Sequence, residues 1–87
     1  MTVVVKKFFA DWCIPCKLLT PILDEVSQEF PSVSFEKIDV EKDIKTTTDY
    51  DIRNLPTVLI FKSNEEVARL SGVKPITVYK KAIAEAL

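Results

Sequence analysis

The chain has 87 residues, of which 47% are hydrophobic and 29% charged, with a formal net charge of −1. This composition predicts one small globular domain over residues 1–87 and excludes a disordered segment. The near balance of charge gives no reason to expect nucleic acid or an anionic membrane as a partner. No apolar run approaches the roughly 20 residues of a spanning helix, and the N-terminus lacks the charge order of a signal peptide. We therefore expect a cytoplasmic monomer.

The first two predicted elements are a strand over residues 3–9 and a helix over about 13–30. The strand carries valine and phenylalanine at both odd and even positions, interrupted by Lys6 and Lys7. Apolar residues on both faces fit a strand that is covered on both sides. The helix shows apolar residues at helical spacing, and Pro21 inside it predicts a kink. The apolar positions of this helix are Cys16, Leu19, Leu23, Val26 and Phe30.

The second half of the chain predicts a strand, a short helix, a hairpin and a final helix. Residues 34–40 form the strand, and Asp43 caps the helix that runs to about Tyr50. Residues 56–61 are apolar throughout, and residues 67–70 follow as a short edge strand after a turn with Asn64 in the left-handed region. Pro75 opens the last helix. Its apolar face comprises Ile76, Tyr79, Ile83, Ala86 and Leu87.

Both cysteines lie at the junction between the first strand and the first helix, in the sequence W-C-I-P-C-K over residues 12–17. A thiol at a helix N-terminus faces unpaired N–H groups and the positive end of the helix dipole, which favours the nucleophilic thiolate. Pro15 suits the first helical turn, and Lys17 adds positive charge. We expect Cys13 to be the exposed attacking sulfur and Cys16 to be the resolving sulfur. The alternative is a pair of inert cysteines or a purely structural bridge.

The segment over residues 9–17 resembles the active site of the thioredoxin family, whose usual motif is W-C-G-P-C-K. Residues 21–25, residues 50–57 and Gly72 extend the resemblance over the chain from Val3 onward. It implies an α/β minimal thioredoxin fold in the order βαβαββα, with a four-stranded mixed sheet and helices on both faces. The first βαβ unit then has a right-handed crossover. It also leads us to expect that the strand and helix that open full-length family members are absent here.

The resemblance also implies a substrate-binding surface. Pro56 matches the family's cis-proline, and the backbone of Leu55 would then pair with a bound substrate strand. Asp51 and Asn54 replace family glycines, and both tolerate left-handed geometry. The implied surface is an apolar rim around Cys13, made by Trp12, Ile14, Leu55, Pro56, Gly72 and Val73.

Two residues depart from the family pattern. Ile14 replaces the glycine between the cysteines and stiffens that turn. Lys7 stands where the family has a buried acid behind the resolving sulfur. Lys7 could stabilise a thiolate, accept a proton as a neutral amine, or extend to the surface, and we expect the last. Lys37 matches a family lysine on the adjacent strand, so crowding should push one ammonium toward solvent. Trp12, Ile14, Pro15, Lys17, Lys7 and Lys37 are thus the residues expected to tune the site.

The sequence therefore predicts an enzyme that reduces protein disulfides through a Cys13–Cys16 dithiol cycle. The resemblance implies a thioredoxin-reductase-type electron donor, and it suggests ribonucleotide reductase as one substrate. We expect no organic cofactor and no metal, because a zinc site needs four ligands, and two cysteines without histidine could complete one only in a dimer or with carboxylates. Two alternatives remain open. One is a thiol oxidase or isomerase, and the other is a docking module whose redox chemistry is incidental.

Overall fold

The computed structural model describes residues 2–87. Its elements follow the predicted order βαβαββα, and most boundaries lie within two residues of those expected. The elements are β1 (Val3–Phe9), α1 (Ile14–Glu29), β2 (Ser34–Asp39), α2 (Ile44–Asp49), β3 (Thr57–Lys62), β4 (Glu65–Ser71) and α3 (Ile76–Ala86). The edge strand β4 is longer than expected, because it pairs with β3 along its whole length.

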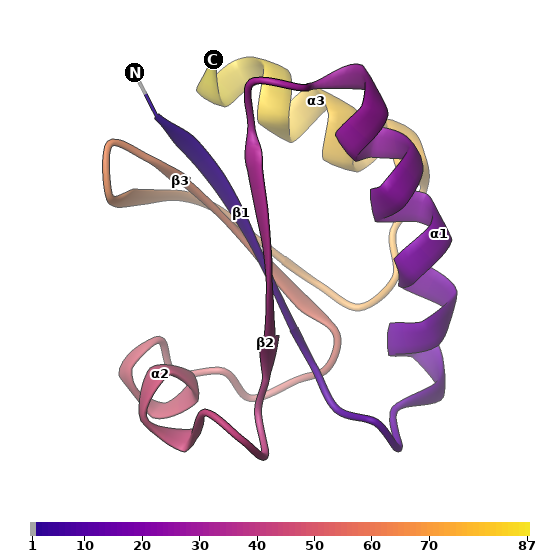
Figure 1. The fold of residues 1–87 in the computed structure, drawn as a ribbon, viewed down its shortest axis with the longest axis vertical. Coiled ribbons are helices and arrows are strands. Elements are labelled where there is room, and N and C mark those ends of the chain that lie inside the picture. The colour runs from indigo at the N-terminus through magenta and orange to yellow at the C-terminus, as the bar shows by residue number, and fades with distance from the viewer. Residues whose placement is uncertain (1) are drawn as a thin grey trace.

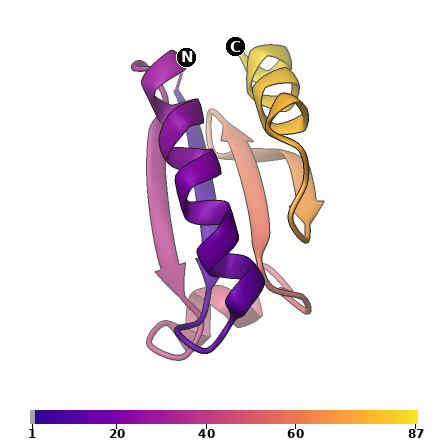
Figure 2. The ribbon, with the colours of Figure 1, turned by 90° about the vertical axis from the view of Figure 1, so that its right-hand side faces the viewer.

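The strands form one mixed sheet in the order β2-β1-β3-β4. β1 and β2 are parallel, whereas β3 is antiparallel to both β1 and β4. Figures 1 and 2 show α1 and α3 together on one face of the sheet and α2 on the other. The predicted fold class, a four-stranded sheet with helices on both faces, is confirmed.

The central strand β1 contributes to a core on each face of the sheet, as its double-sided apolar pattern predicted. Val3 and Val5 pack in the cluster under α1 and α3. Phe8 packs on the opposite face, in the cluster that includes Tyr50 of the α2 side. Because side chains alternate along a strand, Lys7 shares the α1 face with Val3 and Val5. The fold therefore directs Lys7 into the protein.

A left-handed backbone conformation is predicted at three turn residues, and it is confirmed at two of them. Asp51 has φ 54° and Asn64 has φ 69°, with Ser63 beside it at φ 52°. The prediction for Asn54 is wrong, since its φ is not positive. Its carbonyl instead accepts a hydrogen bond from the Thr57 hydroxyl at 2.6 Å, which fixes the loop that enters β3.

Two further expectations concern helix faces. Leu87 does not join the buried face of α3, because it lies past the last helical residue and is 54% exposed. α1 continues as one helix through Pro21, so the expected kink stays a prediction. Among residues 2–87, no helix combines the length and apolar character needed to cross a membrane.

Candidate active site

Cys13 and Cys16 are joined by a disulfide at the start of α1, with their Cα atoms 5.3 Å apart. Cys13 is the N-cap residue, and its Sγ accepts a hydrogen bond from the backbone N–H of Cys16 at 3.2 Å. Its own N–H donates to the carbonyl of Ala10 at 3.1 Å, which fixes the turn after β1. Pro15 occupies the first turn, where its missing N–H costs no helical bond. The predicted strand-to-helix junction is confirmed.

The expectation of an exposed Cys13 is wrong for the disulfide form. Cys13 is 5% exposed and Cys16 is 3% exposed. Both sulfurs pack in a small apolar cluster with Ala10, Phe9 and Leu55, so the bonded pair is nearly covered. The two residues nevertheless border different openings. Cys13 borders an open groove, and Cys16 borders a smaller cavity.

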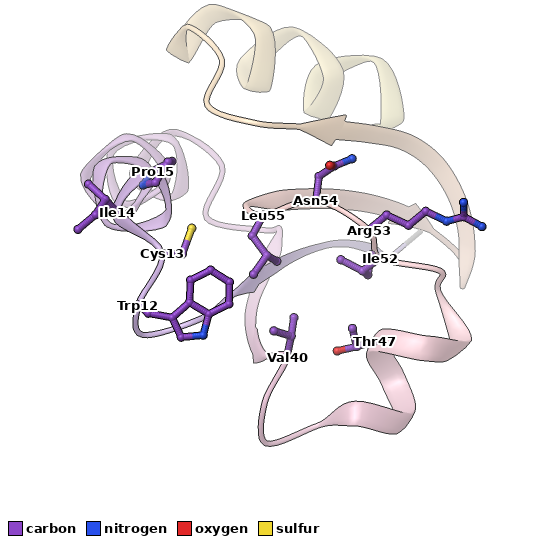
Figure 3. Close-up of a pocket in the computed structure, with 10 residues that line it drawn as sticks. All are labelled: Trp12, Cys13, Ile14, Pro15, Val40, Thr47, Ile52, Arg53, Asn54 and Leu55. Carbon is purple, nitrogen blue, oxygen red and sulfur yellow. The ribbon is translucent and has the colours of Figure 1, made fainter.

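The Cys13 groove has a volume of about 630 Å³ and gathers residues from four parts of the chain (Figure 3). Trp12 and Ile14 are 65% and 64% exposed. In Figure 3 the Trp12 indole lies beside Cys13 with Leu55 near it, while Ile14 points outward from α1. The lining residues are Trp12, Cys13, Ile14, Pro15, Val40, Thr47, Ile52, Arg53, Asn54 and Leu55.

Only part of the predicted apolar rim lines this groove. Trp12, Ile14 and Leu55 do so, whereas Gly72 and Val73 do not. The Leu55–Pro56 peptide bond is cis, as predicted, but Pro56 is fully buried and presents no exposed surface. It is covered because it lies directly before β3, in the centre of the sheet.

Sequence reasoning missed five lining residues: Val40, Thr47, Ile52, Arg53 and Asn54. One of them had a usable signal. Val40 follows β2 as Ala10 follows β1, and the carboxyl ends of parallel strands meet at one edge of a sheet. The other four come from α2 and the loop before β3. Their approach to Cys13 depends on how α2 packs across the sheet.

The loop that contains Gly72 and Val73 is held next to the cis-proline. The N–H of Gly72 donates to the carbonyl of Pro56 at 2.8 Å, and Gly72 adopts φ 79°. The hydroxyl of buried Tyr79 donates to the Gly72 carbonyl at 3.2 Å and accepts from the Lys74 N–H at 3.1 Å. Burial raises the pKa of Tyr79, and the hydrogen bond from Lys74 opposes that rise. Tyr79 therefore anchors this loop from α3.

Lys7 does not extend to the surface as expected. It is 5% exposed, and its Nζ donates to Thr20 Oγ1 at 2.9 Å and lies 5.6 Å from the centre of the Phe9 ring. Burial and the neighbouring ammonium of Lys37 lower the pKa of Lys7, whereas Asp24 raises it. The side chain stays inside because α1 covers its face of β1 and supplies Thr20 as an acceptor.

Lys37 is the lysine that faces solvent, as the crowding of two ammonium groups predicted. It pairs in register with Lys7 across β1 and β2, and its side chain is exposed. Lys17 is exposed as well. All three lysines border the Cys16 cavity, which has a volume of about 190 Å³. The full lining is Lys7, Phe9, Ala10, Asp11, Cys16, Lys17, Thr20 and Lys37.

A disulfide at the N-terminus of a helix, beside a cis-proline loop on a mixed four-stranded sheet, defines a thiol–disulfide oxidoreductase. Comparisons with known proteins agree with this class. The family described as Thioredoxin matches residues 1–85, and the chain belongs to the thioredoxin family.

Individual relatives support the same assignment. Thioredoxin from Chlamydia pneumoniae is 42% identical over 71 residues, which cover 82% of this chain and 70% of the relative. Thioredoxin-1 from Saccharomyces cerevisiae is 37% identical over 81 residues, covering 93% and 78%. The X-ray structure of Fasciola hepatica thioredoxin superposes with a TM-score of 0.92 at 31% identity, covering 99% of this chain and 82% of that one. The protein is thus a thiol–disulfide oxidoreductase with protein-disulfide reductase activity. Family membership implies protein disulfides as substrates and a reductase as electron donor.

Proposed function

We propose that this protein reduces disulfides of other proteins with Cys13 as the nucleophile and Cys16 as the resolving residue. The observation that carries this assignment is the position of each sulfur. Cys13 is the N-cap of α1 and borders the open groove, whereas Cys16 lies one turn into the helix and borders the smaller cavity. An incoming substrate disulfide therefore has an approach to Cys13.

The proposed cycle transfers one pair of electrons from the dithiol to the substrate. Cys13 thiolate attacks one sulfur of the substrate disulfide, and the other sulfur leaves as a thiolate that takes a proton from solvent. Cys16 thiolate then attacks Cys13 Sγ, the Cys13–Cys16 bond forms, and the second substrate sulfur leaves. A thioredoxin-reductase-type donor returns two electrons to the disulfide, which takes up protons as the dithiol reforms.

The start of α1 is suited to hold Cys13 as a thiolate. The N–H of Cys16 already points at Cys13 Sγ, and an N-terminal N–H bonds more strongly to a charged sulfur than to a neutral one. The dipole of this 16-residue helix acts in the same direction. Lys17 adds a nearby exposed positive charge. These effects favour the thiolate of reduced Cys13 over its thiol, and the thiolate is the nucleophile.

The groove residues give the substrate its place. Trp12 and Ile14 expose apolar surface beside Cys13, which suits an extended protein segment. We assign the backbone N–H and C=O of Leu55 to pair with that segment, because the flanking carbonyls of Asn54 and Pro56 are already bonded to Thr57 and Gly72. Gly72 and Val73 flank the segment from the neighbouring loop, and Pro56 fixes the backbone turn rather than offering surface.

The remaining assignments complete this picture. Residues 1–87 act as one domain and as a monomer. The protein works in the cytoplasm, since a disulfide reductase needs a reducing compartment to be recycled. Ribonucleotide reductase, which the resemblance to the family suggests, is one proposed substrate. Ile14, Pro15, Lys17 and Lys37 tune the redox equilibrium of the pair through the turn geometry and charge described above.

Reduction of insulin disulfides, followed by turbidity with dithiothreitol as the electron source, tests the proposal. We expect catalysis by the native chain and its loss in both Cys13→Ser and Cys16→Ser. Equilibration with glutathione buffers, followed through Trp12 fluorescence, gives the direction. A potential near about −270 mV, typical of thioredoxin, supports a reductase, whereas about −180 to −120 mV favours an oxidase or isomerase. The absence of a reversible two-electron transition would leave only the docking-module alternative.

A further inference from the structure

We propose that Lys7 is a positioning residue that holds a positive charge behind the cysteine pair, stabilises the thiolate of Cys16, and shifts the redox equilibrium toward the dithiol. The inference rests on the proposed role of Cys16 as the resolving residue. Lys7 occupies the position where the family has a buried acid. An acid there could accept a proton, whereas Lys7 supplies a positive charge.

The geometry places Lys7 behind Cys16. Lys7 and Cys16 border the same cavity of about 190 Å³, one from β1 and the other from α1. Thr20 links them, because its Oγ1 accepts a hydrogen bond from Lys7 Nζ at 2.9 Å and donates to the Cys16 carbonyl at 3.4 Å. The ammonium has two further hydrogens after this bond. They are available to a charge that develops on Cys16.

The surroundings of Lys7 support its charged form. The face of the Phe9 ring and the carboxylate of Asp24 both favour an ammonium over a neutral amine. Burial and Lys37 act in the opposite direction and lower the pKa of Lys7. The other charged groups that border its two cavities are Asp11, Lys17, Glu36 and Cys16 itself once it is reduced. β3, which pairs with β1 on the side away from β2, contributes uncharged Val58 opposite Lys7.

The charge acts differently on the two redox states. In the disulfide form Cys16 carries no charge, so the buried ammonium has only Thr20, Phe9 and more distant Asp24 as favourable partners. In the dithiol form the Cys16 thiol can release its proton to solvent, and the thiolate so formed attracts the ammonium across the cavity that both residues border. When the donor's two electrons break the Cys13–Cys16 bond, Lys7 therefore stabilises the product. Removing its charge should favour the disulfide.

The test measures the redox equilibrium of the pair against glutathione buffers, by Trp12 fluorescence, in the native chain and in Lys7→Met and Lys7→Gln. We expect both variants to shift the equilibrium constant about tenfold toward the disulfide, or about 30 mV toward more reducing potentials. Lys6→Met is the matched control. It removes the same charge from the adjacent residue of β1, which lies on the opposite face against Tyr50 and Phe61. We expect Lys6→Met to change the redox potential by less than a third of the shift expected for the Lys7 variants.

A second measurement separates thiolate stabilisation from a general effect on folding. In a Cys13→Ser background, the pH dependence of alkylation by iodoacetamide reports the pKa of Cys16 alone, and we expect Lys7→Met to raise that pKa. The inference is overturned if both Lys7 variants keep the native potential, or if Lys6→Met shifts it equally. Failure of the native chain to reduce insulin, with a normal two-electron transition, would refute the proposed reductase function while leaving the Lys7 shift measurable.

Discussion

The buried hydroxyl of Tyr79 on α3 bonds to the carbonyl of Gly72, which joins the last helix to the loop beside the cis-proline. Gly72 in turn donates to Pro56, so a chain of hydrogen bonds runs from α3 to the backbone next to the proposed substrate-binding residue Leu55. A core residue of the C-terminal helix thereby determines the position of a loop at the active-site edge.

Replacement of Tyr79 by phenylalanine should destabilise the protein by about 1–3 kcal/mol, because the Gly72 carbonyl and the Lys74 N–H both lose their partner in a partly buried setting. Urea unfolding of the disulfide form measures this loss. Tyr50→Phe is the control, since the ring of Tyr50 packs edge-on against Phe8 and Phe61 and is retained. Equal losses in the two variants would contradict the anchoring role of Tyr79.

The same hydroxyl should make the native chain lose stability at alkaline pH. Burial raises the pKa of Tyr79 in the folded state above its ordinary value of 10.0. The folded state then holds its proton more tightly than the unfolded state, so this stabilisation is complete below the unfolded pKa and is lost as pH rises beyond it. Unfolding free energies measured between pH 8 and 11 should fall more steeply for the native chain than for Tyr79→Phe.

Cys16→Ser should trap a mixed disulfide with a protein substrate. Cys13 can still attack, but the sulfur that would release the substrate is missing. Non-reducing electrophoresis and mass spectrometry with a disulfide-bonded substrate should show a covalent adduct on Cys13. Cys13→Ser should give much less adduct, because Cys16 borders the smaller cavity rather than the groove. Comparable adducts in both variants would reverse or abolish the proposed roles.

Trp12→Ala should weaken binding of protein substrates without unfolding the chain. The indole is 65% exposed, so its removal should change stability by less than about 0.5 kcal/mol. Loss of an aromatic contact in the docking surface should lower kcat/KM for insulin by about tenfold, which is about 1.4 kcal/mol. Reduction of a small aromatic disulfide should change less. Ile44→Ala, at an exposed apolar residue on α2 outside the groove lining, should leave both rates unchanged.

Lys7→Met should stabilise the disulfide form at neutral pH by about 1 kcal/mol, because a buried charge is replaced by an apolar side chain of similar length. The pKa of Lys7 is lowered in the folded state, so its protonated form opposes folding and native stability recovers as pH rises toward the ordinary value of 10.5. The difference in unfolding free energy between Lys7→Met and the native chain should therefore shrink between pH 8 and 10.5. A constant advantage over that range would show that charge is not its source.

The sequence predicted the order of elements well because each carried a local signal. Alternating faces in β1, the cap at Asp43 and the apolar run of β3 depend on residues close together in the chain. The W-C-I-P-C-K motif likewise located the disulfide. These features need no knowledge of how the elements pack.

The errors arose where packing decides. A lysine gains by reaching water, so the sequence favours an exposed Lys7, and nothing in the local sequence indicates that Thr20 meets it from α1. The resemblance places Pro56 on an exposed rim, whereas the central position of β3 buries it. Arg53 and Thr47 entered the groove only through the placement of α2 and its following loop.

Cys13 borders the groove and Cys16 borders the smaller cavity, so a protein substrate and a proton can reach the disulfide from different sides. A macromolecule held on Cys13 would cover the groove, whereas the cavity beside Cys16 is bordered by the exposed residues Lys17 and Lys37. We expect protons to exchange at Cys16 through this cavity while the substrate is still attached. Substrate binding at Cys13 and proton exchange at Cys16 would then take place on different sides of the same disulfide.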